Sequence, residues 1–224
     1  MLSLLVVTAL LQPQAINTLT PEEKKDGWKL LFDGKSLAGW RNYKQPKGTL
    51  GKGWVIENGT FVSKDPSNAG DIVTEEEFKW FELKVDFKLE KGQNSGIMFH
   101  VIEKGDYAWH SGPEIQIYDD GGEAGAQKTG YLYELYKPTT DVKAPVGEWN
   151  TFRIIVSGKG CATYLNGTKL YEYNLNSPEF KELVKKSKFS VYPEFGAAGK
   201  GRIAIQGDHG VVYFRNVKIK PLKD

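Results

Sequence analysis

Cysteine is nearly absent from this sequence of 224 residues, which contains only Cys161. A single thiol cannot form a disulfide within the chain, and its position before Ala162 in a predicted strand is typical of a small core residue. An excess of charge of one sign is also missing, because 30 basic and 28 acidic residues are interspersed along the chain. We therefore expect no nucleic-acid partner, which would need a strongly basic face.

Long apolar runs are lacking as well, and the run at residues 2–11 is too short to span a bilayer. Its length is that of the core of a signal peptide, and the small residue Ala15 offers a cleavage position. We therefore predict a signal peptide at residues 1–15 and export to the periplasm or the extracellular space. The alternative is an ordered N-terminal strand. No cysteine follows the run to carry a lipid, so we expect no membrane anchor.

Helical patterns are scarce in this chain. The stretch TPEE at residues 20–23 combines a threonine cap, a proline at the first helical position and a glutamate three residues after the cap. It predicts a short helix that ends at Gly27, within a lead-in of residues 16–27. One other short helix is predicted at residues 180–186. The 12% of aromatic residues and the 25 glycines favour many short strands and turns instead.

Strand and turn signals fill the rest of the chain. Residues 58–59 and 166–167 are both Asn-Gly between two strand-like runs, a strong hairpin signal because both turn positions need positive φ. Residues 81–89 alternate between apolar and charged side chains, which predicts a strand with one core face. A bulge is expected at residues 215–216 in the last strand. Roughly a dozen such strands predict one all-β domain at residues 28–224, a jelly-roll sandwich of two antiparallel sheets.

The strand GPEIQIYDD, which starts at Gly112, has two chemically different faces. Because successive side chains of a strand point to opposite sides, Ile115 faces the core while Glu114, Gln116 and Tyr118 face the other way. A carboxylate, an amide and an aromatic ring on one face suit a sugar better than bulk water. We therefore predict a ligand groove on this face.

Residues 95–101 form a second predicted strand of this kind. Its apolar residues Ile97, Phe99 and Val101 are assigned to the core. Gly96, Met98 and His100 face the opposite way, and such a surface, neither charged nor apolar, suits the floor of the groove.

Several ordered motifs resemble the hallmarks of the 3-keto-disaccharide hydrolase family. They extend over nearly the whole predicted domain and together are far more specific than any one of them. The motifs are LFDGKSLAGW (31–40), NSGI (94–97), GPEIQIYD (112–119), GYLY (130–133), GEWN (147–150), NG (166–167), IQGDHG (205–210) and FRNV (214–217).

The resemblance implies a concanavalin A-like lectin/glucanase jelly roll and a bacterial exported hydrolase that acts on glycosides oxidised at C3. A ketone at C3 acidifies the hydrogen on C2, so a base can remove it, an enolate can form and the C1 oxygen can leave. Water then adds to the product. This chemistry needs a base, a donor or cation at the enolate oxygen, and an acid for the leaving group.

The candidate catalytic residues are Glu114 or His100 as base and His209 as donor or acid. A histidine in a polar turn often only bonds its neighbours, and this is the alternative interpretation for His209 and for His110. The candidate substrate-binding residues, which would orient hydroxyls or stack on the sugar, are Gln116, Gln206, Trp109, His110, Tyr118, Tyr133 and Asp119.

A divalent cation is left open as a cofactor. The candidate ligands His100, Glu114, Asp119 and His209 offer suitable oxygen and nitrogen atoms, but they show no local spacing that is typical of a metal site.

Two other functions are compatible with the same residues. A retaining glycosidase would use Glu114 and Asp119 as its two carboxylates, which must lie about 5 Å apart. A carbohydrate-binding module would keep the aromatic and amide residues but would need no base. An adhesin without any site is a third class, and the oligomeric state is not predicted.

Overall fold

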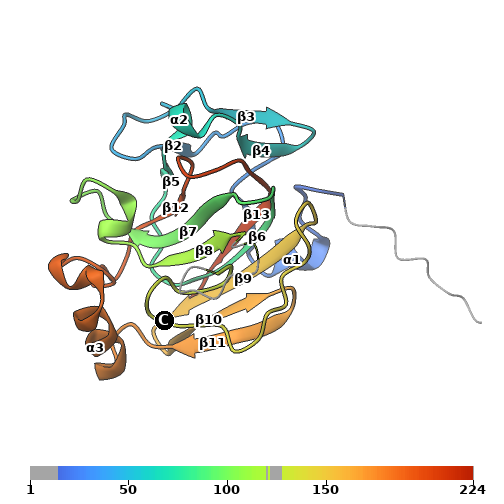
Figure 1. Ribbon diagram of the computed structural model, residues 1–224. Helices are drawn as coiled ribbons and strands as arrows, with labels where there is room; N and C mark the ends of the chain where they lie inside the picture. Colours follow the sequence, from blue (N-terminus) through green and yellow to red (C-terminus); the bar gives the residue numbers. More distant parts are fainter. Residues whose placement is uncertain (1–14, 120, 122–127, 224) are drawn as a thin grey trace, which may run out of the picture.

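The computed structural model describes residues 15–119, 121 and 128–223, which form two antiparallel sheets (Figure 1). The strands of the larger sheet are β1 (Lys29–Leu30), β3 (Trp54–Glu57), β4 (Thr60–Ser63), β6 (Phe81–Leu89), β9 (Asn150–Ser157), β10 (Gly160–Leu165), β11 (Thr168–Tyr173) and β13 (Val212–Pro221). The strands of the smaller sheet are β2 (Trp40–Asn42), β5 (Ile72–Thr74), β7 (Asn94–Val101), β8 (Glu114–Tyr118) and β12 (Arg202–Ile205).

The strand order is far from the order of the sequence. The larger sheet runs β11-β10-β9-β6-β13-β4-β3, with β1 also pairing to β13, and the smaller runs β2-β5-β12-β7-β8. Strands that are distant in sequence therefore become neighbours, and β12 lies between β5 and β7. This architecture confirms the predicted all-β sandwich.

The core lies between the two sheets. The larger sheet contributes the five apolar residues of β6, all buried, from Phe81 to Leu89. The smaller sheet contributes Ile97, Ile115 and Ile205, which belong to the same apolar cluster. Because each fully buried side chain of this size contributes about 1.5–3 kcal/mol, this one cluster supplies much of the stability.

Both predicted Asn-Gly hairpins are confirmed. Asn58 and Gly59 have φ values of 49° and 70° and connect β3 to β4. Asn166 and Gly167 have φ values of 51° and 82° and connect β10 to β11. Positive φ at both turn positions matches the twist of the paired strands, so these turns fix the register of both hairpins.

In the described residues, helix is confined to short segments: α1 (Pro21–Lys25), α2 (Pro66–Ala69), α3 (Pro178–Lys186) and the 3-10 turns η1 (Ala108–His110) and η2 (Lys188–Val191). The first and the third α-helix were predicted. Thr20 Oγ1 accepts from the backbone of Glu23, whose carboxylate accepts from the backbone of Thr20, each at 3.1 Å, so the capping box is formed. Among the described residues, no helix is long and apolar enough to cross a membrane.

The N-terminal prediction is untested by the structure. Residues 1–14 of the predicted signal peptide lie outside the described residues. Export therefore stays a prediction.

A bulge in β7 reverses the faces of its last residues. Met98 pairs with Ala204 of β12 and Val101 pairs with Arg202, so β7 has one more residue than β12 between these pairs. His100 has a φ of 53°, which is unusual outside glycine. As a result Val101 packs with Met98 and Ala204 outside the core between the sheets. The predicted alternation in residues 95–101 is therefore wrong at the end of this strand, because an extra residue exchanges the two faces.

Candidate active site

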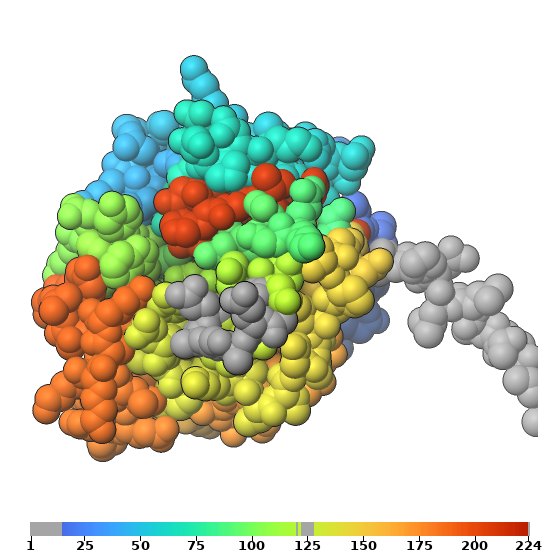
Figure 2. Space-filling model, in the orientation of Figure 1, coloured from blue at the N-terminus to red at the C-terminus, as the bar shows by residue number. Residues whose placement is uncertain are grey.

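A pocket of about 280 Å³ lies on the face of the smaller sheet that points away from the core. Glu114 and Gln116 of β8 line it, while Ile115 and Ile117 of the same strand are in the core, so the two predicted faces of this strand are confirmed. The loops that follow β12 and α3 complete the pocket. In Figure 2 the light-green residues of η1 and its flanking loop border the red residues after β12 and the orange residues after α3. The lining residues are Asn94, Trp109, Glu114, Gln116, Tyr133, Lys188, Phe189, Gln206 and His209.

Glu114 is a buried carboxyl group in this pocket, with 8% of the residue exposed. Burial and, to a smaller extent, the negative charge of Asp71 raise the pKa of Glu114 to about 8, although His209 and Lys188 act in the opposite direction. The group therefore holds its proton for much of the time at neutral pH and becomes a strong base once ionised. Such a raised pKa is common at catalytic sites.

Gly96 of β7 provides the space for this carboxyl group. A Cβ atom at Gly96 would lie 2.1 Å from Glu114 Oε1 and 2.6 Å from its Cδ. Real atoms do not approach so closely, so any side chain at this position would displace the carboxyl group. The contact with Glu114 therefore explains why a glycine occupies the last position of the motif Asn94-Ser95-Gly96.

Gly96→Ala is expected to lower kcat/KM by about 10- to 100-fold, because a carboxyl group displaced by about 1 Å no longer meets the reacting atom correctly. Gly199→Ala is the matched control, since a Cβ atom there would meet nothing within 4 Å. Steady-state kinetics and thermal unfolding of both variants check the prediction. Full activity in a folded Gly96→Ala variant would contradict it.

His209 and Asp208 form a hydrogen-bonded pair in the turn after β12. The Nδ1 atom of His209 bonds the carboxylate of Asp208. This bond raises the pKa of His209 and lowers the pKa of Asp208, since each charged form stabilises the other. The bond therefore favours the protonated imidazole, whose Nε2–H can serve as a proton donor beside the pocket.

Lys188 brings a positive charge to the aromatic wall of the pocket. Its Nζ lies 4.2 Å from the ring centroid of Tyr133 and 5.1 Å from that of Trp109, distances at which a cation interacts with a ring face. Lys188 and Phe189 were missed by the sequence analysis. Lys188 is one of four lysines between residues 181 and 188, and no pattern there indicates which lysine faces the pocket.

Amide side chains line the opposite part of the pocket. Gln116 Nε2 donates to Asn94 Oδ1 at 2.6 Å, which fixes the orientation of both groups. The backbone of Gln206 is held by two bonds, from its N–H to Gly96 O at 3.0 Å and from Ser95 Oγ to its carbonyl at 2.7 Å. The structure thus places Gln116, Gln206, Trp109 and Tyr133 in the pocket, as predicted, together with Glu114 and His209.

His100 does not line this pocket, so its predicted place on the groove floor is wrong. The bulge turns the ring toward Phe81 and Phe99, whose centroids lie 6.1 Å and 5.5 Å from that of His100. Its Nε2 bonds the carbonyl of Lys79 at 2.6 Å. Burial lowers the pKa of His100, so the ring is neutral in the folded protein.

His100→Asn is expected to lower the free energy of unfolding by about 1–3 kcal/mol, because the shorter side chain leaves the Lys79 carbonyl without this partner. Asparagine tolerates positive φ, so the backbone can stay in place. The kcat/KM of the folded variant is expected to stay close to that of the parent. Denaturant unfolding and kinetics measure the two effects, and a large loss of turnover in stable protein would restore a catalytic role for His100.

Three other predicted site residues lie outside the lining of the pocket. The ring of His110 stacks on Tyr192 at 4.0 Å, and burial lowers the pKa of His110. Tyr118 lies opposite Asn94 at the end of β8. The buried carboxylate of Asp119 accepts from the backbone of Gly92 at 2.8 Å.

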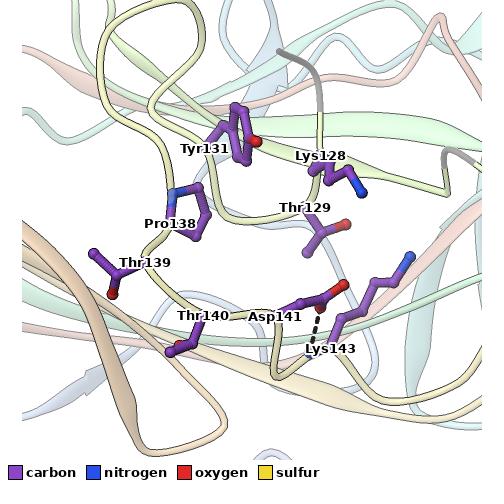
Figure 3. A pocket seen from close by; sticks show the side chains of 8 residues that line it. All are labelled: Lys128, Thr129, Tyr131, Pro138, Thr139, Thr140, Asp141 and Lys143. Carbon is purple, nitrogen blue, oxygen red and sulfur yellow. Dashed lines mark hydrogen bonds between the residues drawn. The ribbon is translucent and has the colours of Figure 1, made fainter. Parts of the chain in front are cut away.

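Asp119 is also 3.5 Å from Lys143 Nζ, and Lys143 belongs to a separate hollow of about 210 Å³ (Figure 3). In that hollow the carboxylate of Asp141 accepts from the backbone of Lys143 at 3.2 Å. Because Asp119 is engaged there and does not line the pocket of Glu114, the arrangement does not supply the two facing carboxylates of a retaining glycosidase.

The four metal ligands considered from the sequence are not brought together. Only Glu114 and His209 share the pocket. Within residues 15–119, 121 and 128–223, no group of three or more His, Cys, Asp or Glu side chains is arranged to hold a metal ion.

Comparisons with known proteins agree with this geometry. The profile of a family described as "3-keto-alpha-glucoside-1,2-lyase-like domain" matches residues 27–220. A 3-keto-disaccharide hydrolase of Bacteroides thetaiotaomicron is 30% identical over 233 residues, which cover 88% of this chain and 79% of that protein.

Solved structures show the same fold. A protein of Parabacteroides distasonis, provisionally described as a glycosyl hydrolase, has a TM-score of 0.83 and 33% identity and covers 93% of this chain and 100% of its own. A second such protein from that organism has a TM-score of 0.65 and 28% identity, covering 87% and 99%. An endo-beta-1,3(4)-glucanase, at 12% identity and a TM-score of 0.50 over 94% of this chain and 95% of its own, shares the fold alone. The sandwich is therefore of the concanavalin A-like class.

Proposed function

Since this chain belongs to the family of 3-keto-alpha-glucoside-1,2-lyase-like domains and is a hydrolase of glycosides, we propose that it cleaves glycosides that carry a ketone at C3 of the sugar. The observation that carries the proposal is the meeting of three groups in one pocket: the buried carboxyl group of Glu114, the imidazole of His209 and the ammonium group of Lys188. These are the base, the acid and the cation that elimination next to a ketone requires.

In the proposed reaction, ionised Glu114 removes the proton from C2, and the electron pair moves toward the C3 oxygen. Lys188 stabilises the negative charge of this enolate. The electron pair then forms a double bond between C2 and C1 while the bond from C1 to the leaving oxygen breaks, and His209 donates the proton to that oxygen. Water adds to C1, and a proton returns to C2, so the sum is hydrolysis.

The choice of His209 as acid and Glu114 as base follows from their surroundings. Asp208 favours the protonated form of His209, whereas burial gives ionised Glu114 a strong tendency to take a proton. Gln116, Gln206 and Asn94 are suited to bond the hydroxyl groups of the sugar, and Trp109 and Tyr133 offer apolar rings to its carbon-bound hydrogens.

The test is incubation with 3-keto-trehalose, 3-keto-lactose and an aryl 3-keto-glucoside in deuterated water. Cleavage with rapid entry of deuterium at C2 is expected. The isolated sugar product, incubated with buffer alone, measures exchange that occurs without the protein. Cleavage without deuterium at C2 would indicate direct displacement, and no cleavage of any of the three compounds would refute the proposed function.

A further inference from the structure

Two loops that are far apart in the sequence meet at the rim of the active-site pocket. The first, residues 102–111 between β7 and β8, contains η1 and carries Trp109. The second, residues 187–196 after α3, contains η2 and carries Lys188 and Phe189. Figure 2 shows these two segments, in light green and in orange, side by side. Their separation therefore decides how Trp109 and Lys188 lie relative to each other.

The ring of Tyr192, in the second loop, packs against two rings of the first loop. It lies nearly parallel to the ring of His110, with centroids 4.0 Å apart and an interplanar angle of 21°. Its centroid is 5.2 Å from that of Trp109, at an interplanar angle of 89°. Stacked and edge-to-face arrangements are both favourable for aromatic rings. Tyr192 thus contacts Trp109, which lines the pocket, and its neighbour His110, which does not.

The imidazole of His110 is oriented for this contact by its own loop. The backbone N–H of Asp106 donates to Nδ1 of His110 at 3.2 Å. A Cβ atom at Gly105 would lie 2.5 Å from the Cβ atom of His110 and 2.6 Å from its Nδ1, so a glycine is needed for the loop to pass this close to the ring. The ring is therefore fixed by its loop before it meets Tyr192.

Two further interactions join the loops. The N–H of Gly196 donates to the carbonyl of Ser111 at 2.9 Å, at the end of the first loop. Lys104 pairs with Glu194 at 2.7 Å, but the side chains are 67% and 40% exposed, and an ion pair so exposed to water contributes little. The ring contact of His110 is the one that lies directly beside Trp109.

We propose that the stacking of His110 on Tyr192 holds the two loops together and thereby sets the position of Lys188 beside Trp109, so that both are positioning residues. The inference rests on the proposed function, in which the charge of Lys188 stabilises the enolate. Lys188 begins η2 and Tyr192 caps its end, so a movement of one is transmitted to the other within a single short turn. A displacement of about 1 Å is enough to lower the rate of a positioned group.

The first test is the kinetics of Tyr192→Ala with a 3-keto glycoside. The variant is expected to lower kcat about tenfold with a smaller change in KM, because a displaced Lys188 affects mainly the transition state. Tyr192→Phe keeps the ring and is expected to stay within about twofold of the parent. Val191→Ala is the matched control, since this neighbouring side chain is 72% exposed. Equal losses in the alanine and phenylalanine variants of Tyr192 would overturn the inference.

A second background separates positioning from a general loss of structure. In Lys188→Met the group to be positioned is gone, so the further change Tyr192→Ala is expected to lower kcat by less than about twofold. A full tenfold loss in this background would show that Tyr192 acts on the protein in some other way, and would overturn the inference.

Hydrogen exchange tests the contact without any substrate. Tyr192→Ala is expected to raise amide exchange in residues 102–111, which carry no substitution, while Tyr192→Phe and Val191→Ala leave it near the parent level. Unchanged exchange in residues 102–111 of Tyr192→Ala would overturn the inference even if the parent cleaves 3-keto glycosides. Absence of all cleavage by the parent would instead refute the proposed function, and with it the positioning role, even if exchange rises as expected.

Discussion

Glu114→Gln is expected to lower kcat/KM toward a 3-keto glycoside by about 10²- to 10⁴-fold, the range found when a general base is removed. The amide has almost the same shape as the carboxyl group but cannot accept a proton at C2. The fold should be retained, since Gly96 leaves room for either group. Glu172→Gln, at an exposed glutamate paired with Lys169 on β11, is the matched control. A variant that keeps near-full activity would remove Glu114 from the mechanism.

The pH dependence of kcat/KM is a second test of the role of Glu114. Because the pKa of Glu114 is raised to about 8, its ionised form is scarce below that pH. Because the proposed mechanism needs ionised Glu114 and protonated His209 together, the kcat/KM of the parent is expected to rise with pH on the acidic side and to fall again in the alkaline range, which gives a bell-shaped profile. The residual activity of Glu114→Gln should lack this rise. A profile already level at pH 6 would contradict the assignment.

The contribution of Glu114 to the free energy of unfolding should fall with rising pH, over the range in which kcat/KM rises. The pKa of Glu114 is about 8 in the folded protein and near 4.5 in the unfolded chain, so the stability contributed by its protonated form is fully present below pH 4.5. That contribution is lost as the pH rises through 8. Glu114→Gln is therefore expected to match the parent in thermal unfolding near pH 4.5 and to exceed it at pH 9. A catalytic group that lowers stability is common at active sites.

Lys188→Met is expected to lower kcat/KM by about 10²- to 10³-fold, as found when a donor to a developing oxyanion is lost. Methionine keeps the apolar contacts with Tyr133 and Trp109 but removes the charge that would stabilise the enolate. Lys188→Arg should keep part of the activity, because it keeps the charge. Lys185→Met, at an exposed position of α3, is the matched control.

The Lys188 prediction also separates two explanations of the pocket. In a binding module, the loss of one ammonium group would weaken binding of oxidised and unoxidised sugars to a similar extent. In the proposed enzyme the loss appears mainly in kcat, since the charge on oxygen exists only during the reaction. Equal changes in binding of both sugars with no change in kcat would favour the binding module.

The predictions from sequence succeeded where the signal is local. Residues 81–89 and 114–118 alternate within a single strand, and residues 58–59 and 166–167 need positive φ whatever surrounds them. The bulge at residues 215–216 was also recognised from its own residues, and a register shift after Arg215 confirms it.

The errors arose where a distant contact decides the conformation. Alternation alone places His100 on the groove floor, whereas the pairing of β7 with β12, a strand far along the chain, inserts the extra residue that turns it away. Lys188 was missed because its place depends on how the segment after α3 packs against Trp109 and Tyr133. Neither contact leaves a periodic pattern in the sequence.

The hydrogen bond between His100, near the end of β7, and the carbonyl of Lys79 connects the two layers, since Lys79 leads into β6 of the opposite sheet. The strand β7, which carries Gly96 and pairs with the strand of Glu114, is therefore attached to the opposite sheet as well as to its neighbours. At the rim, by contrast, Trp109 and Lys188 are held by short 3-10 turns and their loops. A rigid base with an adaptable entrance would let the proposed acid and base accept leaving groups of different shape.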